Sequence, residues 1–270
     1  MIIFGGSFDP IHNAHIAIAN YVHNLLFSNQ ILAMESLNIH HNSLSLAKRT
    51  MQHKIYFIPN NGNTNYKTKS DVESKTRIEM LRLVVASNHH FALKNNEIIH
   101  KEYRPTFITL QDIYNDINQN NIQNFNNDFS RNIYFIIGSD SLLQLDTWEN
   151  WQQILELSNL IVIPRDNFMI DDACYYKFQQ YFIQDIKEII STDINQYCHD
   201  GKNNFNQQNN EELLIKQLLL CKNGVIYIAN NCPLLNISAT MIRSNLRNNV
   251  SIAHLVPKYI DEYIKQYQLY

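Results

Sequence analysis

The chain has 270 residues, of which 45% are hydrophobic, and a formal net charge of −3 at pH 7. It is long enough to bury a sizeable core, and its charge gives no basic field that would argue for a nucleic-acid partner. No stretch approaches the roughly 18 apolar residues of a membrane span, and the first residues lack the basic region of a signal peptide. The four cysteines show neither a C-x-x-C pair nor the spacing of a disulfide framework. We therefore expect reduced thiols and a cytoplasmic protein.

Apolar runs and amphipathic segments alternate along the chain. The predicted strands are 1–5, 54–61, a short strand or hairpin near 91–99, the apolar run of 131–141, 159–164 and 224–230. The predicted helices are 14–27, 73–87, one starting near Thr106, 148–158, 174–189, 210–221, 236–247 and 257–267. We expect one domain over 1–270, with insertions or irregular segments at 28–53, 115–130 and 166–222.

This alternation predicts an α/β fold, a Rossmann-like doubly wound parallel sheet with helices on both faces. In such sheets ligands bind beyond the carboxyl ends of the strands. The polar loops that follow the predicted strands are therefore the candidate sites.

The first candidate is GGSFDPIHNAH, residues 5–15. Its glycines follow a strand, as in a turn that approaches a phosphate, although neither G-x-G-x-x-G nor the P-loop pattern is present. His12 and His15 share one face if they begin a helix, where imidazoles and free N–H groups can donate to phosphate oxygens. The alternative is an ordinary strand–turn–helix in which Asp9 caps the helix and the histidines are surface residues.

The second candidate is NISATMIRSNLR, residues 236–247. Ser238 can cap a helix, and Thr240 and Arg243 lie on one face above its N-terminus. A guanidinium, hydroxyls and free N–H groups suit a phosphate chain. The alternative is a capped helix with an exposed arginine.

Two further loops follow predicted strands. In IIGSDS, Gly138 and Asp140 can present backbone groups and a carboxylate to a nucleotide, while Trp148 can stack on a flat heterocycle or belong to the core, as can Trp151. The loop around Lys67 carries cations that can hold phosphates, although exposed lysines usually have no specific role.

With these segments quoted, the chain resembles a known family. GGSFDPIHNAH is similar to the G-[ST]-F-D-P-x-H-x-G-H signature of the adenylyltransferase superfamily, and NISATMIR to its I-S-x-T-x-I-R signature. YFIPNN, FIIGSDSLLQLDTWENWQQIL, NLIVIPR and LVPKYIDEYIKQYQLY are similar, in order, to bacterial nicotinate-nucleotide adenylyltransferases. The resemblance runs nearly end to end outside 28–53, 115–130 and 166–222. Ala14 departs from it, because the family usually has glycine there.

The resemblance implies a nucleotidyltransferase fold and the transfer of AMP from ATP to nicotinic acid mononucleotide, giving deamido-NAD and pyrophosphate, with Mg²⁺. It implies catalytic roles for His12, His15 and Arg243. It implies ATP-binding roles for Gly5, Gly6, Ser7, Phe8, Gly138, Asp140, Ile237, Ser238 and Thr240. It implies pyridine-nucleotide-binding roles for Lys67, Thr106, Trp148 and Arg165.

This reaction explains why the motifs supply no general base and no covalent nucleophile. The attacking phosphate is already ionised near neutral pH, so neither a general base nor a covalent nucleophile is needed. The site has to position the phosphates in line and neutralise their charge. Two alternatives stay open: transfer to nicotinamide mononucleotide or another phosphorylated metabolite, and a nucleotide-binding regulator without catalysis. The missing G-x-G-x-x-G argues against a Rossmann oxidoreductase.

Overall fold

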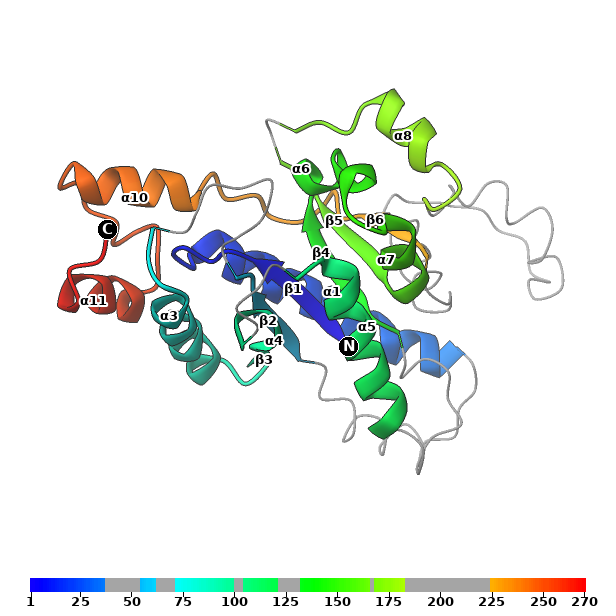
Figure 1. The fold of residues 1–270 in the computed structure, drawn as a ribbon, viewed down its shortest axis with the longest axis horizontal. Coiled ribbons are helices and arrows are strands. Elements are labelled where there is room, and N and C mark those ends of the chain that lie inside the picture. Colours follow the sequence, from blue (N-terminus) through cyan, green and yellow to red (C-terminus); the bar gives the residue numbers. More distant parts are fainter. Residues whose placement is uncertain (37–53, 62–70, 100–103, 121–131, 166–167, 183–223) are drawn as a thin grey trace, which may run out of the picture.

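The computed structural model describes residues 1–36, 54–61, 71–99, 104–120, 132–165, 168–182 and 224–270 (Figure 1). Within them, six strands form one sheet in the order β3-β2-β1-β4-β5-β6, and all neighbouring strands are parallel. The strands are β1 (Ile2–Gly6), β2 (Ile55–Pro59), β3 (Phe91–Leu93), β4 (Tyr134–Gly138), β5 (Asn159–Ile163) and β6 (Ile226–Ile228). The predicted parallel α/β sheet is confirmed.

The helices largely follow the predicted segments. They are α1 (Asn13–Ser36), α3 (Ser74–Ser87), α4 (Asn96–Ile99), α5 (Thr106–Asn120), α6 (Ser139–Leu142), the 3-10 helix η2 (Leu145–Thr147), α7 (Trp151–Leu157), α8 (Asp172–Phe178), α10 (Ala239–Arg247) and α11 (Lys258–Gln266). The hairpin considered near 91–99 is wrong, because β3 is followed by the short helix α4. The helix predicted over 210–221 lies outside the described residues.

Two segments expected to be irregular begin as helix. Helix α1 continues through 28–36 and α5 through 115–120, so the described start of each segment is helical. The sequence SNQILAMES contains strong helix formers and neither glycine nor proline, so nothing in it stops the helix. Of the segment 166–222, the described part contains α8, which ends at Phe178.

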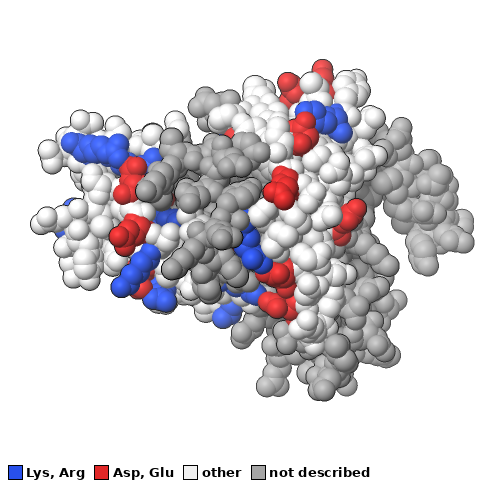
Figure 2. Space-filling model, viewed as in Figure 1, with Lys and Arg blue, Asp and Glu red and all other residues white. Residues whose placement is uncertain are grey.

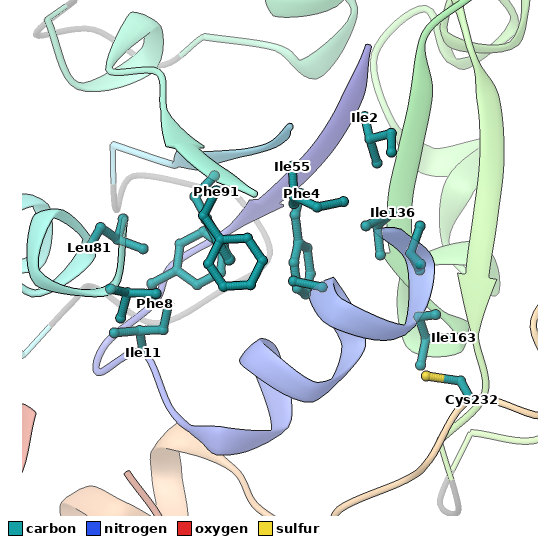
Figure 3. Close-up of a cluster of buried hydrophobic side chains, with 14 of the residues drawn as sticks. Ile2, Phe4, Phe8, Ile11, Ile55, Leu81, Phe91, Ile136, Ile163 and Cys232 are labelled. Carbon is teal, nitrogen blue, oxygen red and sulfur yellow. The ribbon is translucent and has the colours of Figure 1, made fainter. Parts of the chain in front are cut away.

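Alternating residues of the strands feed two hydrophobic clusters, one on each face of the sheet. Ile2 and Phe4 of β1 enter the first cluster, together with residues of α1, α3, α10 and α11. Ile3 enters the second cluster, together with residues of α5 and α7. Figure 3 shows part of the first cluster, in which Phe4, Phe8 and Phe91 lie together. Helices therefore cover both faces, as a doubly wound sheet requires.

The strand order places the switch point of the sheet between β1 and β4. The GGS turn follows β1 and the GSD turn follows β4, so both open at the same edge. Ligands of doubly wound sheets bind at this point. In Figure 1, α10 and α11 lie near one end of the molecule together with α3, and the C-terminus lies between them.

Within the described segments, no helix is long and apolar enough to cross a membrane.

Cys174 and Cys232 are buried free thiols, and burial raises the pKa of the Cys232 thiol to about 11. A buried thiol with a raised pKa is a poor nucleophile. Cys198 and Cys221 lie outside the described residues.

Candidate functional site

The loop after β1 turns back on the sheet through Phe8. Its φ is 48°, in the left-handed region, and its side chain is only 1% exposed. The Phe8 ring packs edge-on against Phe4 and Phe57, with centroids 5.6 and 5.4 Å away. A Cβ at Gly6 would lie 3.0 Å from this ring, so glycine lets the loop fold back. The buried ring supports the loop, and only its backbone is left to line a nucleotide.

His12 and His15 form a stacked pair where the loop enters α1. Their ring centroids are 3.7 Å apart and the rings are inclined by 25°. The backbone N–H of His12 donates to Nδ1 of His15 at 3.3 Å, so neutral His15 carries its proton on Nε2. His15 is thereby held in the tautomer that presents Nε2–H as a donor.

His12 is neutral at physiological pH. It is 4% exposed, and Nδ1 is buried without a hydrogen-bond partner among the described residues. Burial, and to a smaller extent the charge of Arg165, lowers the pKa of His12 to about 3. The alternative in which this histidine is a surface residue is therefore wrong. As a neutral imidazole, His12 can donate one N–H.

Asp9 is a buried acceptor at the centre of the loop. Its Oδ2 accepts from the backbone N–H of Asp71 at 2.8 Å, and its Oδ1 accepts from the hydroxyl of Tyr270 at 2.7 Å. Helix α1 begins at Asn13, so Asp9 is not the helix cap that the sequence allowed. Its carboxylate instead joins three segments that are far apart in the chain.

Arg77 of α3 fixes the ends of β1 and β2. Its side chain has no exposed surface, and it donates to the carbonyls of Ser7 at 2.6 Å and Asn60 at 2.8 Å. It also donates to the hydroxyl of Ser74 at 3.0 Å. Burial lowers the pKa of the guanidinium, while the charge of Asp9 raises it. No sequence motif singles out Arg77.

Helix α10 is attached to the same loop through Arg243. Nη1 donates to the backbone carbonyl of Asp9 at 2.7 Å, Nε pairs with the carboxylate of Asp71 at 3.0 Å, and Nη2 donates to Thr240 Oγ1 at 3.4 Å. Arg247 also pairs with Asp71. Ser238 caps the helix by accepting from the N–H of Met241 at 3.1 Å, as predicted. The two signature motifs therefore contact each other.

The ends of β4 and β5 form a second group beside the first. Asp140 pairs with Arg165 at 3.1 Å, and the backbone N–H of Arg165 donates to the buried hydroxyl of Ser139 at 3.0 Å. A Cβ at Gly138 would lie 2.3 Å from Oδ1 of Asp140 and 2.9 Å from Nε of Arg165, so a larger residue would require this ion pair to shift. Because Arg165 acts on the pKa of His12, the two groups share one electrostatic environment.

Among the remaining predicted residues, Trp148, Thr106 and Ile237 lie within the described part of the chain. Trp148 is partly buried against the second hydrophobic cluster, at the end of η2. Thr106 is the first residue of α5. Lys67 lies outside the described residues. Ile237 packs partly against the first hydrophobic cluster, and Ala14 is 7% exposed.

Two residues of the site, Asp71 and Tyr270, are absent from the sequence predictions. Asp71 belongs to no quoted segment, and Tyr270 ends the segment LVPKYIDEYIKQYQLY, in which it was given no role. Each contacts Asp9 across a large sequence separation, of 62 and 261 positions. Figure 2 shows acidic and basic side chains of the described residues interspersed over one face. The charges that matter for the site are therefore those of individual neighbouring side chains.

We expect Arg77→Met to lower the free energy of unfolding by about 2–4 kcal/mol, because the carbonyls of Ser7 and Asn60 lose a buried charged donor. Arg82→Met on the same helix is the matched control. Arg82 is exposed and pairs with Glu79, so its loss should change stability by less than about 1 kcal/mol. Urea denaturation measures both variants, and equal losses would contradict the assigned role.

The pKa of His12 predicts a loss of stability in acid. The unfolded chain takes up a proton on this residue below about pH 6.5, whereas the folded protein does so only near pH 3. The free energy of unfolding should therefore fall as the pH drops, with His12 contributing about 2 kcal/mol of the loss by pH 5.

Urea denaturation of the wild type and of His12→Asn at pH 7.5 and pH 5.0 measures this contribution. The variant should lose less stability between the two pH values than the wild type. His254→Asn, at an exposed histidine, is the control and should behave as the wild type does. If His12→Asn showed the full pH dependence, the buried neutral imidazole would be disproved.

Comparisons with known proteins agree with this geometry. The family model described as Cytidylyltransferase-like matches residues 3–43 and 37–245. The probable nicotinate-nucleotide adenylyltransferase of Legionella pneumophila (strain Paris) is 26% identical over 269 residues, which are 99% of this chain and 97% of that protein. The protein of the same description from Yersinia enterocolitica serotype O:8 is 26% identical over 268 residues, covering 99% and 94%.

Among solved structures, Plasmodium falciparum nicotinic acid mononucleotide adenylyltransferase complexed with NaAD matches with a TM-score of 0.57. The identity is 19%, and the match covers 99% of this chain and 95% of that one. This likeness confirms the nucleotidyltransferase fold. The family model, which spans most of the chain, confirms the family resemblance. The chain belongs to the cytidylyltransferase-like family.

Proposed function

We propose that the chain transfers the AMP moiety of ATP to nicotinic acid mononucleotide, forming deamido-NAD and pyrophosphate in NAD biosynthesis. The observation that carries this proposal is the contact between the two signature motifs at the switch point. The loop that bears the histidine pair is bonded through Asp9 to Arg243 of α10. The near full-length relatives described as nicotinate-nucleotide adenylyltransferases support the same reaction.

The reaction is a displacement at the α-phosphorus of ATP. A phosphate oxygen of the mononucleotide forms the new bond, the bond from the α-phosphorus to the bridging oxygen breaks, and pyrophosphate leaves with the electron pair. No side chain has to take a proton from the attacking group. The protein has to align the phosphate of the mononucleotide with the α-phosphate and the departing pyrophosphate of ATP. It also has to offset the charge that moves to pyrophosphate.

The site residues divide between the substrates as follows. Nε2–H of His15 and the N–H of neutral His12 donate to the ATP phosphates. Arg243 of α10 supplies a positive charge to the same phosphates. The backbone of the loop after β1 and the start of α10 line the same phosphates. These residues are Gly5, Gly6, Ser7, Phe8, Ile237, Ser238 and Thr240.

The turn after β4 serves the rest of the substrates. Gly138 and Asp140 contact the adenosine part. Arg165, Trp148, Thr106 and Lys67 serve the pyridine nucleotide. In this assignment, Arg165 contacts an anionic substrate and either gives up its ion pair with Asp140 or keeps both contacts.

ATP enters as its magnesium complex in this proposal. The described residues contain no group of three His, Cys, Asp or Glu side chains able to hold a metal ion, and Mg²⁺ commonly binds through substrate phosphates with few protein ligands. When bound, the ion neutralises phosphate charge. A single domain over 1–270 and a cytoplasmic location belong to the same proposal.

Pyrophosphate release with ATP and each of the two mononucleotides tests the function. We expect strong preference for the nicotinate form. His15→Ala should lower kcat by about 100-fold or more, because an oriented donor to the phosphates is lost, while ATP binding weakens less. His89→Ala, at an exposed histidine before β3, is the control and should retain activity.

Two results would contradict the proposal. Equal turnover of the two mononucleotides would disprove the specificity. Absence of turnover by folded wild-type protein would disprove the activity and favour a nucleotide-binding regulator.

A further inference from the structure

We propose that Tyr270 is a positioning residue for the reaction: its hydroxyl holds the loop after β1 in the conformation that presents His12 and His15. The reaction named here is the proposed function above, on which this inference rests. The carrying observation is the hydrogen bond from Tyr270 to the buried carboxylate of Asp9, at 2.7 Å.

The segment that follows α11 is held in a specific conformation. Gln268 and Tyr270 have φ values of 50° and 72°, in the left-handed region that non-glycine residues disfavour. The backbone N–H of Leu269 donates to the carbonyl of Ile264 at 3.1 Å, and the side chains of Leu269 and Tyr270 pack against the first hydrophobic cluster. The surrounding contacts therefore hold the segment against its local preference.

The bond to Asp9 has a defined direction. Burial, followed by the hydrogen bond to Asp9, raises the pKa of the Tyr270 phenol above its ordinary range, so the hydroxyl keeps its proton and donates. Asp9 is 3% exposed, and a buried carboxylate depends on donors that compensate for lost hydration. Loss of this hydroxyl removes one such donor from Oδ1, while Asp71 still donates to Oδ2.

The position of Asp9 transmits this effect to the reacting groups. Its own carbonyl accepts from Arg243, and it lies three residues before His12. Arg77 holds the carbonyl of Ser7 on the other side of Phe8. With both flanks fixed, a change at the Asp9 side chain falls on the peptide units between Phe8 and His12. Displacements of a fraction of an ångström in such units are enough to misalign a phosphate donor.

A general loss of stability after Tyr270→Phe would be a different effect from a displaced loop. The chain offers a matched control that separates the two effects. Tyr259 of α11 forms a hydrogen bond of 2.9 Å between its hydroxyl and that of Ser87, and it packs against the same cluster. Tyr259→Phe thus deletes the same atom and one hydrogen bond of the same residue type, away from the loop. Both Tyr→Phe variants keep the ring that packs against the core.

The first measurement is amide hydrogen exchange over residues 7–12, which reads the loop whether or not the protein is active. We expect Tyr270→Phe to accelerate exchange there by about fivefold, and Tyr259→Phe to leave it unchanged. Melting temperatures of the two variants should agree within about 2 °C. Equal exchange at 7–12 in both variants would overturn the inference.

The second measurement is steady-state kinetics with ATP and nicotinic acid mononucleotide. Tyr270→Phe should lower kcat by about tenfold with less than a twofold change in KM for the mononucleotide, and Tyr259→Phe should match the wild type. In an Asp9→Asn background, Tyr270→Phe should have little further effect, because both changes disrupt one bond. Equal kcat for the two tyrosine variants, or additive effects with Asp9→Asn, would overturn the inference. Inactive wild-type protein would disprove the proposed function instead, and hydrogen exchange would still decide the role of Tyr270.

Discussion

A guanidinium with no exposed surface determines how the carboxyl edge of the sheet is built. Arg77 reaches from α3 to the carbonyls of Ser7 and Asn60, which follow neighbouring strands. A buried charge is tolerated only where donors, acceptors and an opposite charge surround it, and Asp9 supplies that charge. The position of Asp9 in turn decides where Arg243 and α10 lie. The loop that carries Phe8 and the histidine pair begins between these contacts, at Ser7 and Asp9.

The electrostatics of the site differ from those of a basic phosphate-binding surface. Arg77 and Arg243 donate to backbone carbonyls, and Arg165 pairs with Asp140, so their charge is engaged within the protein. His12 is neutral, because its burial and the nearby Arg165 oppose protonation. In the proposed function, polyanions are thus met by oriented N–H donors and by the start of α10 more than by net charge. A chain with a formal charge of −3 can bind ATP on these terms.

The sequence predicted the parallel sheet, most of its helices and the two loops that meet at its edge, because these depend on local periodicity, caps and glycines. The polar composition of 28–53 and 115–130 did not indicate that α1 and α5 continue into these segments as helix. The sequence offered Asp9 as a helix cap in one alternative, whereas its partners are Asp71 and Tyr270. Such pairings leave no periodic signal, and the folded chain alone brings them together.

The separation of these partners along the chain has a consequence for the order in which the protein matures. Contacts between distant residues form late, because closing a long loop is entropically costly until other packing has shortened it. The ninth residue is bonded to residues 71, 243 and 270, so the loop leaves the ribosome long before its last partner does. A nascent chain can build the first strands and α3 while its histidines are still not held in place. In the proposed reaction, the loop is therefore held in place only after Tyr270 has docked, long after the loop itself has been made.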